Sequence, residues 1–337
     1  MRMSETSLGE WKNKRVLVTG AGGFIGSHLV EALVQQGAQV KAFVRYNSRG
    51  DPGFLNMLPP ELFEQLEILA GDLRDLPALT SAARDVDTIL HLGALIAIPY
   101  SYRHPADVVE TNVIGTLNVL LAARENGVQR VVHTSTSEVY GTARQVPISE
   151  DHPLQGQSPY SASKIGADKL AESFYDSYEL PVVTLRPFNT YGPRQSARAV
   201  IPTIISQVLS SDVIRLGNLD ARRDFTFVSD TVNGFLCAAS TPGVEGKTFN
   251  LGTGSEIRVG DLVDEIVSIV GKPVRIEVAP DRLRPTRSEV QRLISDNRQA
   301  RERLGWSPQV SLHEGLTRTV EWIDAHLNLY RPNQYTV

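Results

Sequence analysis

Short apolar runs alternate with longer amphipathic segments through the first 188 residues. The run at 15–19 (RVLVT) predicts a strand, and apolar residues that recur at helical spacing over 24–36 predict a helix that Gly37 ends. The same pattern predicts further strands at 40–45, 66–70, 88–92, 130–134 and 182–186, and long helices at 105–126 and 159–178. Strands that alternate with helices indicate an α/β fold with a doubly wound parallel sheet covered on both faces.

The pattern loosens in the second half of the chain, where short helical and strand-like segments alternate. A strand-like run at 248–251 is placed to rejoin the first sheet, and a final amphipathic helix is predicted at 312–327. We therefore expect a larger domain over 1–188, which elements of 226–253 rejoin, and a smaller domain over 189–330 that is interleaved with it.

Composition and charge place the chain among ordinary globular proteins. It has 337 residues, 41% hydrophobic and 21% charged, with 34 Lys and Arg against 38 Asp and Glu and a net charge of −4. Because the charges are mixed and their sum is small, the chain lacks the basic footprint of a nucleic-acid-binding protein. We expect no nucleic-acid partner.

Cys237 is the only cysteine, which excludes an intramolecular disulfide and a multi-cysteine metal site. We predict no metal centre. The first residues (MRMSETSLGEWKNK) hold no apolar core of signal-peptide length, and the longest apolar stretch, 89–98, is too short for a membrane span. These observations predict a soluble, cytoplasmic protein without a membrane partner.

A glycine-rich turn joins the first predicted strand to the first predicted helix. Gly20, Gly23 and Gly26 form G-x-x-G-x-x-G there, with Phe24 and Ile25 at the start of the helix. Such a turn permits backbone conformations that a Cβ forbids and a close approach to a pyrophosphate. The helix N-terminus supplies free N–H groups and the positive end of its dipole. The motif in this context predicts a dinucleotide-binding site.

The end of the second strand bears on the choice of cofactor. An NAD site of this type carries a carboxylate there, which accepts hydrogen bonds from the ribose 2′-hydroxyl. This chain has a basic and polar run in that place: Arg45, Asn47, Ser48 and Arg49. Because a guanidinium suits a 2′-phosphate, these residues favour NADP, with NAD as the alternative. Further cofactor contacts are expected after later strands, at Asp72, Leu73, Leu92 and Ala94.

Tyr160 and Lys164 stand in Y-S-A-S-K at the start of the helix at 159–178, and their spacing of four puts both side chains on one helix face. A free tyrosine titrates near pH ~10 and is a poor base at neutral pH. An adjacent ammonium and the positive charge of a nicotinamide favour the phenolate, so we expect the Tyr160 pKa to be lowered. The pair predicts a base that removes a hydroxyl proton.

A loop rich in hydroxyl groups, TSTSEVYG at 134–141, follows the strand at 130–134. The Thr136 hydroxyl is placed to share a substrate proton with Tyr160. Glu138 is more specific evidence, because a site that only oxidises and reduces does not need a carboxylate, whereas proton abstraction beside a newly formed ketone needs a base. An exposed loop carboxylate is the alternative interpretation.

These motifs resemble the extended short-chain dehydrogenase/reductase superfamily and, within it, the nucleotide-sugar 4,6-dehydratases. The resemblance covers nearly the whole chain and includes S-P-Y-S-A-S-K, R-P-F-N-T-Y-G-P-R at 186–194 and R-D-F at 223–225. The sequences of 158–175 and 186–205 resemble those of the subgroup that acts on nucleotide-activated N-acetylglucosamine in legionaminic acid biosynthesis. The resemblance implies a Rossmann fold and an enzyme that removes water from a hexose by way of a transient 4-ketone.

The resemblance implies a catalytic role for each matching residue. Thr136, Tyr160 and Lys164 correspond to the oxidation triad, and Glu138 corresponds to the base that acts at C5 of the sugar. Ser137 stands where relatives acting on dTDP-glucose carry an aspartate as general acid, and where those acting on GDP-mannose also have serine. The departing C6 hydroxyl then receives its proton either from Glu138 or through a relay at Ser137.

The same resemblance implies where the ligands lie. Pro187 and Asn189 match the segment beneath the nicotinamide and the sugar, and Arg223 and Arg284 match positions that hold the diphosphate. The expected substrate contacts are Ser135, Asn189, Arg194, Val200, Arg223 and Arg284. The partner is then a nucleotide-diphosphate sugar, and by the same analogy the two long helices pair across a homodimer.

Three other functions fit the same residues. A UDP-glucuronate decarboxylase also oxidises C4 and can carry serine and glutamate after this strand, but it releases carbon dioxide in place of water. A 4-epimerase of the superfamily usually lacks an acid at the position of Glu138. A non-catalytic sensor of nucleotide or redox state would keep the pocket, although the intact set of Thr136, Tyr160 and Lys164 argues against it.

Overall fold

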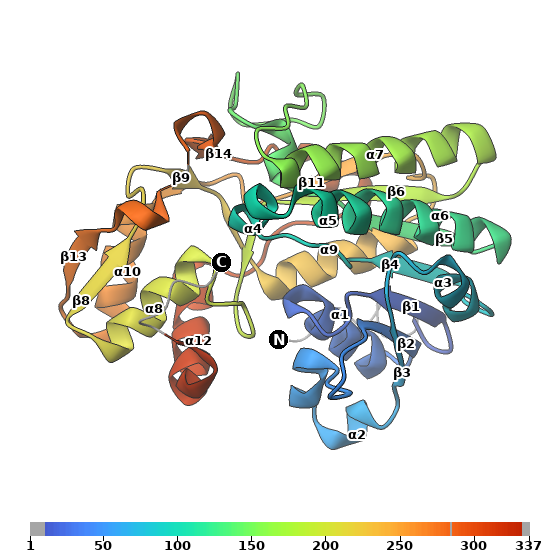
Figure 1. Cartoon of the computed structure of the whole chain (residues 1–337), viewed down its shortest axis with the longest axis horizontal. Helices are drawn as coiled ribbons and strands as arrows, with labels where there is room; N and C mark the ends of the chain where they lie inside the picture. Colours follow the sequence, from blue (N-terminus) through green and yellow to red (C-terminus); the bar gives the residue numbers. More distant parts are fainter. Residues whose placement is uncertain (1–10, 284, 332–337) are drawn as a thin grey trace.

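A parallel sheet of seven strands forms the centre of the molecule (Figure 1). The computed structural model describes residues 11–283 and 285–331. The strands are β1 (Arg15–Thr19), β2 (Gln39–Arg45), β3 (Glu67–Gly71), β4 (Thr88–His91), β5 (Arg130–Thr134), β6 (Val182–Pro187) and β11 (Thr248–Leu251). Their order across the sheet is β11-β6-β5-β4-β1-β2-β3, and every neighbouring pair is parallel, which confirms the predicted fold.

Helices cover both faces of this sheet. They are α1 (Phe24–Gln35), α3 (Leu76–Ala82), α6 (Gly115–Glu125), α7 (Pro159–Tyr178) and α9 (Val228–Ser240). On one face α6 packs between α3 and α7, and on the other α1 packs against α9. Because successive side chains of a strand point to opposite faces, β1 places Val16 and Val18 in one hydrophobic core and Leu17 in the other.

The helix predicted at 105–126 is divided in the structure. It consists of α5 (Pro105–Val109), a π-helical turn at Glu110–Ile114, and α6. Asn112 in the turn is buried, and its side chain pairs with both backbone groups of Leu95, at 2.8 and 2.9 Å. The wider turn thus accompanies a long-range contact, which the local periodicity does not reveal.

The helical stretch Pro105–Glu125 is long and apolar enough to cross a membrane when only length and composition are considered. A core helix of a globular protein meets the same criterion. Half of this stretch is buried, where α6 packs against α3 and α7.

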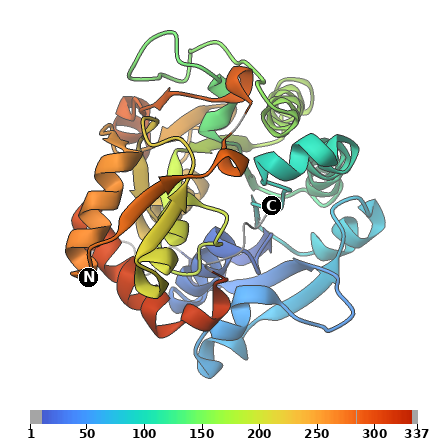
Figure 2. The same ribbon diagram turned by 60° about the vertical axis from the view of Figure 1, so that its left-hand side comes forward.

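A smaller part of the chain lies beside the main sheet (Figure 2). Its strands are β7 (Asn189–Tyr191), β8 (Val213–Leu216), β9 (Arg222–Arg223), β10 (Phe225–Phe227), β12 (Ile257–Arg258), β13 (Arg275–Val278) and β14 (Arg292–Leu293), and its helices are α8 (Val200–Ser210), α10 (Val259–Val270), α11 (Arg298–Leu304) and α12 (Leu312–Ala325). The chain crosses between the two parts, since β11 pairs with β6 of the main sheet. The division into domains at residue 188 stays a prediction.

Candidate active site

A cavity of about 1100 Å³ lies between the carboxyl ends of the sheet strands and the smaller part of the chain. In an open α/β sheet this is where ligands bind. Sites for a single small molecule reach about 1,000 Å³, so this cavity has room for more than one ligand. The predicted site residues that line it are Gly20, Gly23, Phe24, Ile25, Gly26, Arg45, Asn47, Leu92, Ala94, Ser135, Thr136, Ser137, Glu138, Tyr160, Pro187, Asn189, Val200 and Arg223.

The glycine turn forms one wall of the cavity and leaves no room for side chains. Gly20 has φ +70°, and a Cβ there would lie 2.8 Å from the Gly93 nitrogen; a Cβ on Gly26 would lie 2.2 Å from the Gly20 oxygen. Gly23 precedes α1 and provides no side-chain cap, so the first N–H groups of this helix have no capping side chain. The turn and the helix end therefore fit a dinucleotide pyrophosphate.

The loop after β2 presents one arginine and one carboxylate to the cavity. Arg45 and Asn47 line it, whereas Ser48 and Arg49 do not. Asp51, which the sequence reasoning missed, also lines it, but its Oδ1 already accepts hydrogen bonds from Gly53 N and Asn56 Nδ2, both at 2.9 Å.

Asp72 is held by a neighbouring arginine. Arg74 Nε lies 2.9 Å from Asp72 Oδ1, and Arg74 Nη2 lies 2.7 Å from Asp72 Oδ2. These hydrogen bonds lower the pKa of Asp72 to about 2. Asp72 and Leu73 are absent from the cavity lining, and Leu73 packs under Gly93 and Gly115. A cofactor contact of Asp72, as predicted from the sequence, would therefore compete with its ion pair to Arg74.

The predicted catalytic residues come together where β5 and α7 meet the cavity. A capping box between Ser158 and Ser161 fixes the start of α7, which places Tyr160 in its first turn. The Thr136 hydroxyl is hydrogen-bonded to Tyr160 and accepts a second hydrogen bond from Glu138 N, at 3.2 Å. Lys164 is buried one helical turn beyond Tyr160, behind the cavity wall.

Burial dominates the electrostatics of Tyr160. It raises the pKa of the phenol; the hydrogen bond with Thr136 opposes this shift, and the charges of Glu138 and Asp168 add to it. The polypeptide alone therefore shifts this pKa in the direction opposite to the one expected from the sequence. Burial also lowers the pKa of Lys164 to about 8, against the opposing charge of Asp168.

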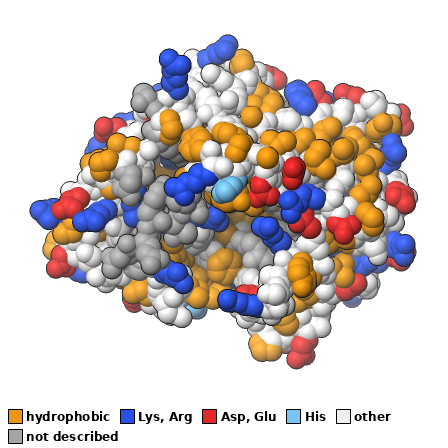
Figure 3. Space-filling view, in the orientation of Figure 1, with side chains coloured by type: hydrophobic (Ala, Val, Ile, Leu, Met, Phe, Trp, Pro, Cys, Tyr) orange, Lys and Arg blue, Asp and Glu red, His pale blue; other side chains and the backbone are white. Residues whose placement is uncertain are grey.

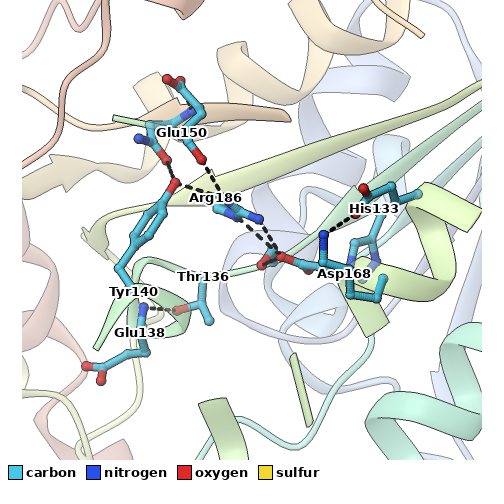
Figure 4. Close-up of polar contacts among 11 residues, drawn as sticks. His133, Thr136, Glu138, Tyr140, Glu150, Asp168 and Arg186 are labelled. Carbon is cyan, nitrogen blue, oxygen red and sulfur yellow. Dashed lines mark hydrogen bonds and ion pairs between the residues drawn. The ribbon is translucent and has the colours of Figure 1, made fainter. Parts of the chain in front are cut away.

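Asp168 is the centre of a buried polar network behind the catalytic residues (Figure 4). Its carboxylate accepts hydrogen bonds from Ser135 Oγ at 2.8 Å and from Arg186 Nε and Nη2 at 3.2 and 3.1 Å, and it lies 3.1 Å from His133 Nε2. Arg186 also donates to the Tyr140 hydroxyl at 3.0 Å. Ser135, a predicted substrate contact, thus gives its hydroxyl proton to this network although it lines the cavity.

Substitution of Asp168 by Asn is expected to cost about 3–5 kcal/mol of unfolding free energy, because it leaves the buried Arg186 guanidinium without its counter-charge. Urea denaturation of the purified variant measures this loss. Asp176→Asn, on the exposed side of the same helix, is the matched control and should change stability by less than about 0.5 kcal/mol. Equal stabilities for the two variants would show that the network does not support the fold.

The substrate side of the cavity holds some of the predicted contacts and not others. Asn189 donates to Asp224 O at 3.2 Å, and Arg223 pairs with Glu289 at 3.4 Å. Arg194 is absent from the lining, because it is buried against α1. The sequence did not predict this contact, since Arg194 is far from α1 along the chain. Arg284 lies outside the described residues. Residues that the sequence reasoning did not single out also line this side: Tyr102, Arg103 and Gln195.

A glycine turn that fits a dinucleotide, a tyrosine and lysine one helical turn apart and a carboxylate on the same wall define an enzyme of the dinucleotide-dependent α/β class. A sequence model of the family described as GDP-mannose 4,6 dehydratase matches residues 17–319. The chain is 37% identical to UDP-glucose 4-epimerase from Mycolicibacterium smegmatis, over 91% of this chain and 98% of that protein. It is 34% identical to dTDP-glucose 4,6-dehydratase from Streptomyces griseus, over 94% and 96%.

Solved structures agree with this class. The dTDP-glucose 4,6-dehydratase from Streptomyces venezuelae, solved with NAD bound, superposes with a TM-score of 0.82 at 31% identity, over 94% of this chain and 99% of that one. The chain belongs to the GDP-mannose 4,6 dehydratase family, within the nucleotide-sugar dehydratases and epimerases of the extended short-chain dehydrogenase/reductase superfamily.

Proposed function

We propose that the protein is a nucleotide-sugar 4,6-dehydratase, which converts a nucleotide-diphosphate hexose to its 4-keto-6-deoxy derivative. The observation that carries the proposal is the position of Glu138, on the cavity wall in the turn that begins at Thr136 and close enough to Tyr160 to raise its pKa. A base beside the oxidising tyrosine is what removal of a C5 proton requires. The sugar is proposed to be N-acetylglucosamine, on the resemblance of 158–175 and 186–205.

Bound along the glycine turn, a nicotinamide cofactor would accept a hydride from C4, return it at C6 and, when oxidised, place a positive charge near Tyr160. Tyr160 removes the proton of the C4 hydroxyl, and Lys164 supports the phenolate by its charge. The new ketone acidifies C5, and Glu138 takes the C5 proton. The C6 hydroxyl leaves as water with a proton from Glu138, because Ser137 is not a strong acid.

Proton balance then assigns a further task to Thr136. Glu138 has given its proton to the departing water, so the proton that completes C5 comes from the one that Tyr160 removed. The Thr136 hydroxyl is hydrogen-bonded to Tyr160 and accepts a hydrogen bond from the backbone N–H of Glu138 at 3.2 Å, so it lies next to the phenol that holds this proton. We propose that Thr136 takes part in the transfer of this proton from Tyr160. Arg223 is assigned to the diphosphate, which its guanidinium suits.

The cofactor is proposed to be NADP, with NAD as the alternative that the NAD-bound structure of the Streptomyces venezuelae relative keeps open. Two observations support NADP. Arg45 ends β2 at the cavity, and the two carboxylates nearby, Asp51 and Asp72, are engaged with Asn56 and Arg74.

Replacement of Arg45 by Ala is expected to weaken NADP binding at least about tenfold, since a charge-assisted hydrogen bond contributes about 1.5–3 kcal/mol. NAD binding should change much less. Fluorescence titration with the two reduced cofactors measures both constants. Arg49→Ala, at an arginine outside the cavity lining, is the matched control. Equal losses for NADP and NAD in Arg45→Ala would contradict the assignment.

A homodimer in the cytoplasm is proposed as the working form. Hydrophobic side chains gather over α6 and α7 (Figure 3). Among those exposed on α5 to α7 are Val109, Ile114, Tyr175 and Tyr178. Paired helices from two copies would cover them.

A 4-epimerase is the second candidate, because the Mycolicibacterium smegmatis relative has that activity in its name. Incubation with UDP-, dTDP- and GDP-hexoses and with UDP-glucuronate, followed by mass spectrometry, separates the candidates. Loss of water supports the dehydratase, and an unchanged mass with an inverted C4 supports the epimerase. Loss of carbon dioxide indicates the decarboxylase, and tight binding without turnover indicates a sensor.

A further inference from the structure

A segment that lines the substrate side of the cavity is tied to the helix that begins at the glycine turn. Arg194 Nη2 lies 2.7 Å from Glu31 Oε2, and Arg194 Nη1 donates to Ser27 Oγ at 3.4 Å. Both partners belong to α1. The Arg194 side chain is only 10% exposed, so this ion pair is made in a largely dry environment rather than at the surface.

A second contact joins the same two segments. His28 Nε2 lies 3.0 Å from Pro193 O. Burial lowers the pKa of His28 to about 4, so the ring is neutral at physiological pH and Nε2–H donates to the carbonyl. Glu31 lies one helical turn after Ser27 and His28, so it is a neighbour of both on the surface of α1. Three side chains of α1 thus hold two consecutive residues of the loop.

The backbone of the loop is strained where it is held. Arg194 has φ +67°, a left-handed conformation that is costly for a residue with a side chain. Such a conformation persists only where the surroundings fix it. Here the Glu31 and Ser27 contacts do so, and the strain would be released if they were lost.

The loop then continues directly into the cavity. Gln195, Ser196, Arg198 and Ala199 line it, and α8 begins at Val200. Gln195 Nε2 donates to Thr190 O at 2.8 Å, but its Oε1 is buried without a hydrogen-bond partner among the described residues. A buried acceptor in this state is costly, and a donor from a bound ligand would satisfy it.

We propose that Arg194 is a positioning residue that couples the two ligand sites. Cofactor bound at the N-terminus of α1 orders the 193–199 loop in the conformation that binds the nucleotide sugar. The contacts of Glu31, Ser27 and His28 with the loop transmit this effect. The coupling is entropic, because the first ligand orders a loop that the second ligand would otherwise have to order. By linkage, nucleotide sugar strengthens cofactor binding by the same factor. The inference rests on the proposed placement of the two ligands, and does not depend on which reaction follows.

Hydrogen exchange of the full-length protein with and without NADP or NAD tests the coupling. In the unchanged protein, cofactor should slow exchange in the glycine turn at 20–26 and in the 193–199 loop. In Arg194→Met it should slow exchange only in the glycine turn. Equal cofactor-dependent protection of the loop in both proteins, or none in the unchanged protein, would overturn the proposal. Because this measurement needs no turnover, it remains decisive even when the protein proves not to be a dehydratase.

A binding measurement separates coupling from simple loss of stability. UDP, dTDP and GDP serve as probes, titrated calorimetrically with and without saturating cofactor; affinity for the preferred probe should rise about fivefold or more with cofactor in the unchanged protein. Glu31→Gln keeps the shape of the side chain and covers the case in which Arg194→Met does not fold. It should abolish this rise. Glu314→Gln, which breaks the exposed Arg318 pair on α12, is the control and should retain it. A full rise in Glu31→Gln would contradict the coupling.

Discussion

Glu138→Gln is expected to oxidise the sugar at C4 but not to release water. The amide has the shape of the carboxylate and cannot take the C5 proton, so the ketone and the reduced cofactor should accumulate together. The rate of dehydration should fall about 10²–10⁴-fold, the contribution typical of a positioned general base. Single-turnover absorbance of the reduced cofactor, with mass spectrometry of the sugar, follows both steps.

Glu150→Gln is the matched control for this variant. Glu150 is a half-buried carboxylate that accepts hydrogen bonds from Asn250 N and Gln299 Nε2, and it does not line the cavity. Burial raises its pKa, which favours the neutral form that glutamine imitates. Dehydration should persist in this control. Unchanged dehydration in Glu138→Gln would remove Glu138 from the mechanism.

Tyr160→Phe is expected to abolish C4 oxidation and everything that follows, with a loss of at least about 10³-fold in kcat, because phenylalanine lacks the phenolate that takes the C4 hydroxyl proton. Cofactor binding should be retained. Tyr46→Phe, at an exposed position outside the cavity lining, is the control and should keep full activity. Substantial turnover by Tyr160→Phe would show that another group is the base.

The Tyr160 mechanism also predicts a pH dependence with a definite sign. Burial lowers the pKa of Lys164 to about 8, so the ammonium is present below that pH and is lost as the pH rises through it. Its charge supports the Tyr160 phenolate. The alkaline side of the kcat profile should therefore fall from about pH 8 upward, and Lys164→Met should lose this limb together with most of the activity.

The local pattern was sufficient for the sheet but not for the helix at 105–126. A buried strand appears in the sequence as a short run of apolar residues. The seven strands of the main sheet lie close to the positions that such runs predicted. The π-helical turn accompanies the contact of Asn112 with Leu95, two residues that only the folded chain brings together. Periodicity of apolar residues carries no information about such a pair.

In the candidate site, too, the features that the sequence predicted are local ones. The glycine turn and the Tyr160 helix could be predicted because all residues of each motif lie close together in the sequence. The position of Arg194 could not be predicted, because Glu31 is far away in the sequence and a guanidinium suits a carboxylate as well as a diphosphate. Asp168 lies one helical turn from Lys164, and a charged residue on that buried face was the available signal for the network.

The direction of the Tyr160 pKa shift could not be predicted from the sequence either. The sequence shows the charges near a phenol but not how deeply it is buried, and burial sets the direction of its shift.

Turnover of nucleotide hexoses in deuterated water tests whether the protein is a 4,6-dehydratase. We expect a product that has lost one water, carries one solvent deuterium at C5 and keeps the original C4 hydrogen at C6, because the protons held by Glu138, Tyr160 and Thr136 exchange with solvent, whereas the transferred hydride does not. A product of unchanged mass with inverted C4, or one without deuterium at C5, would contradict it.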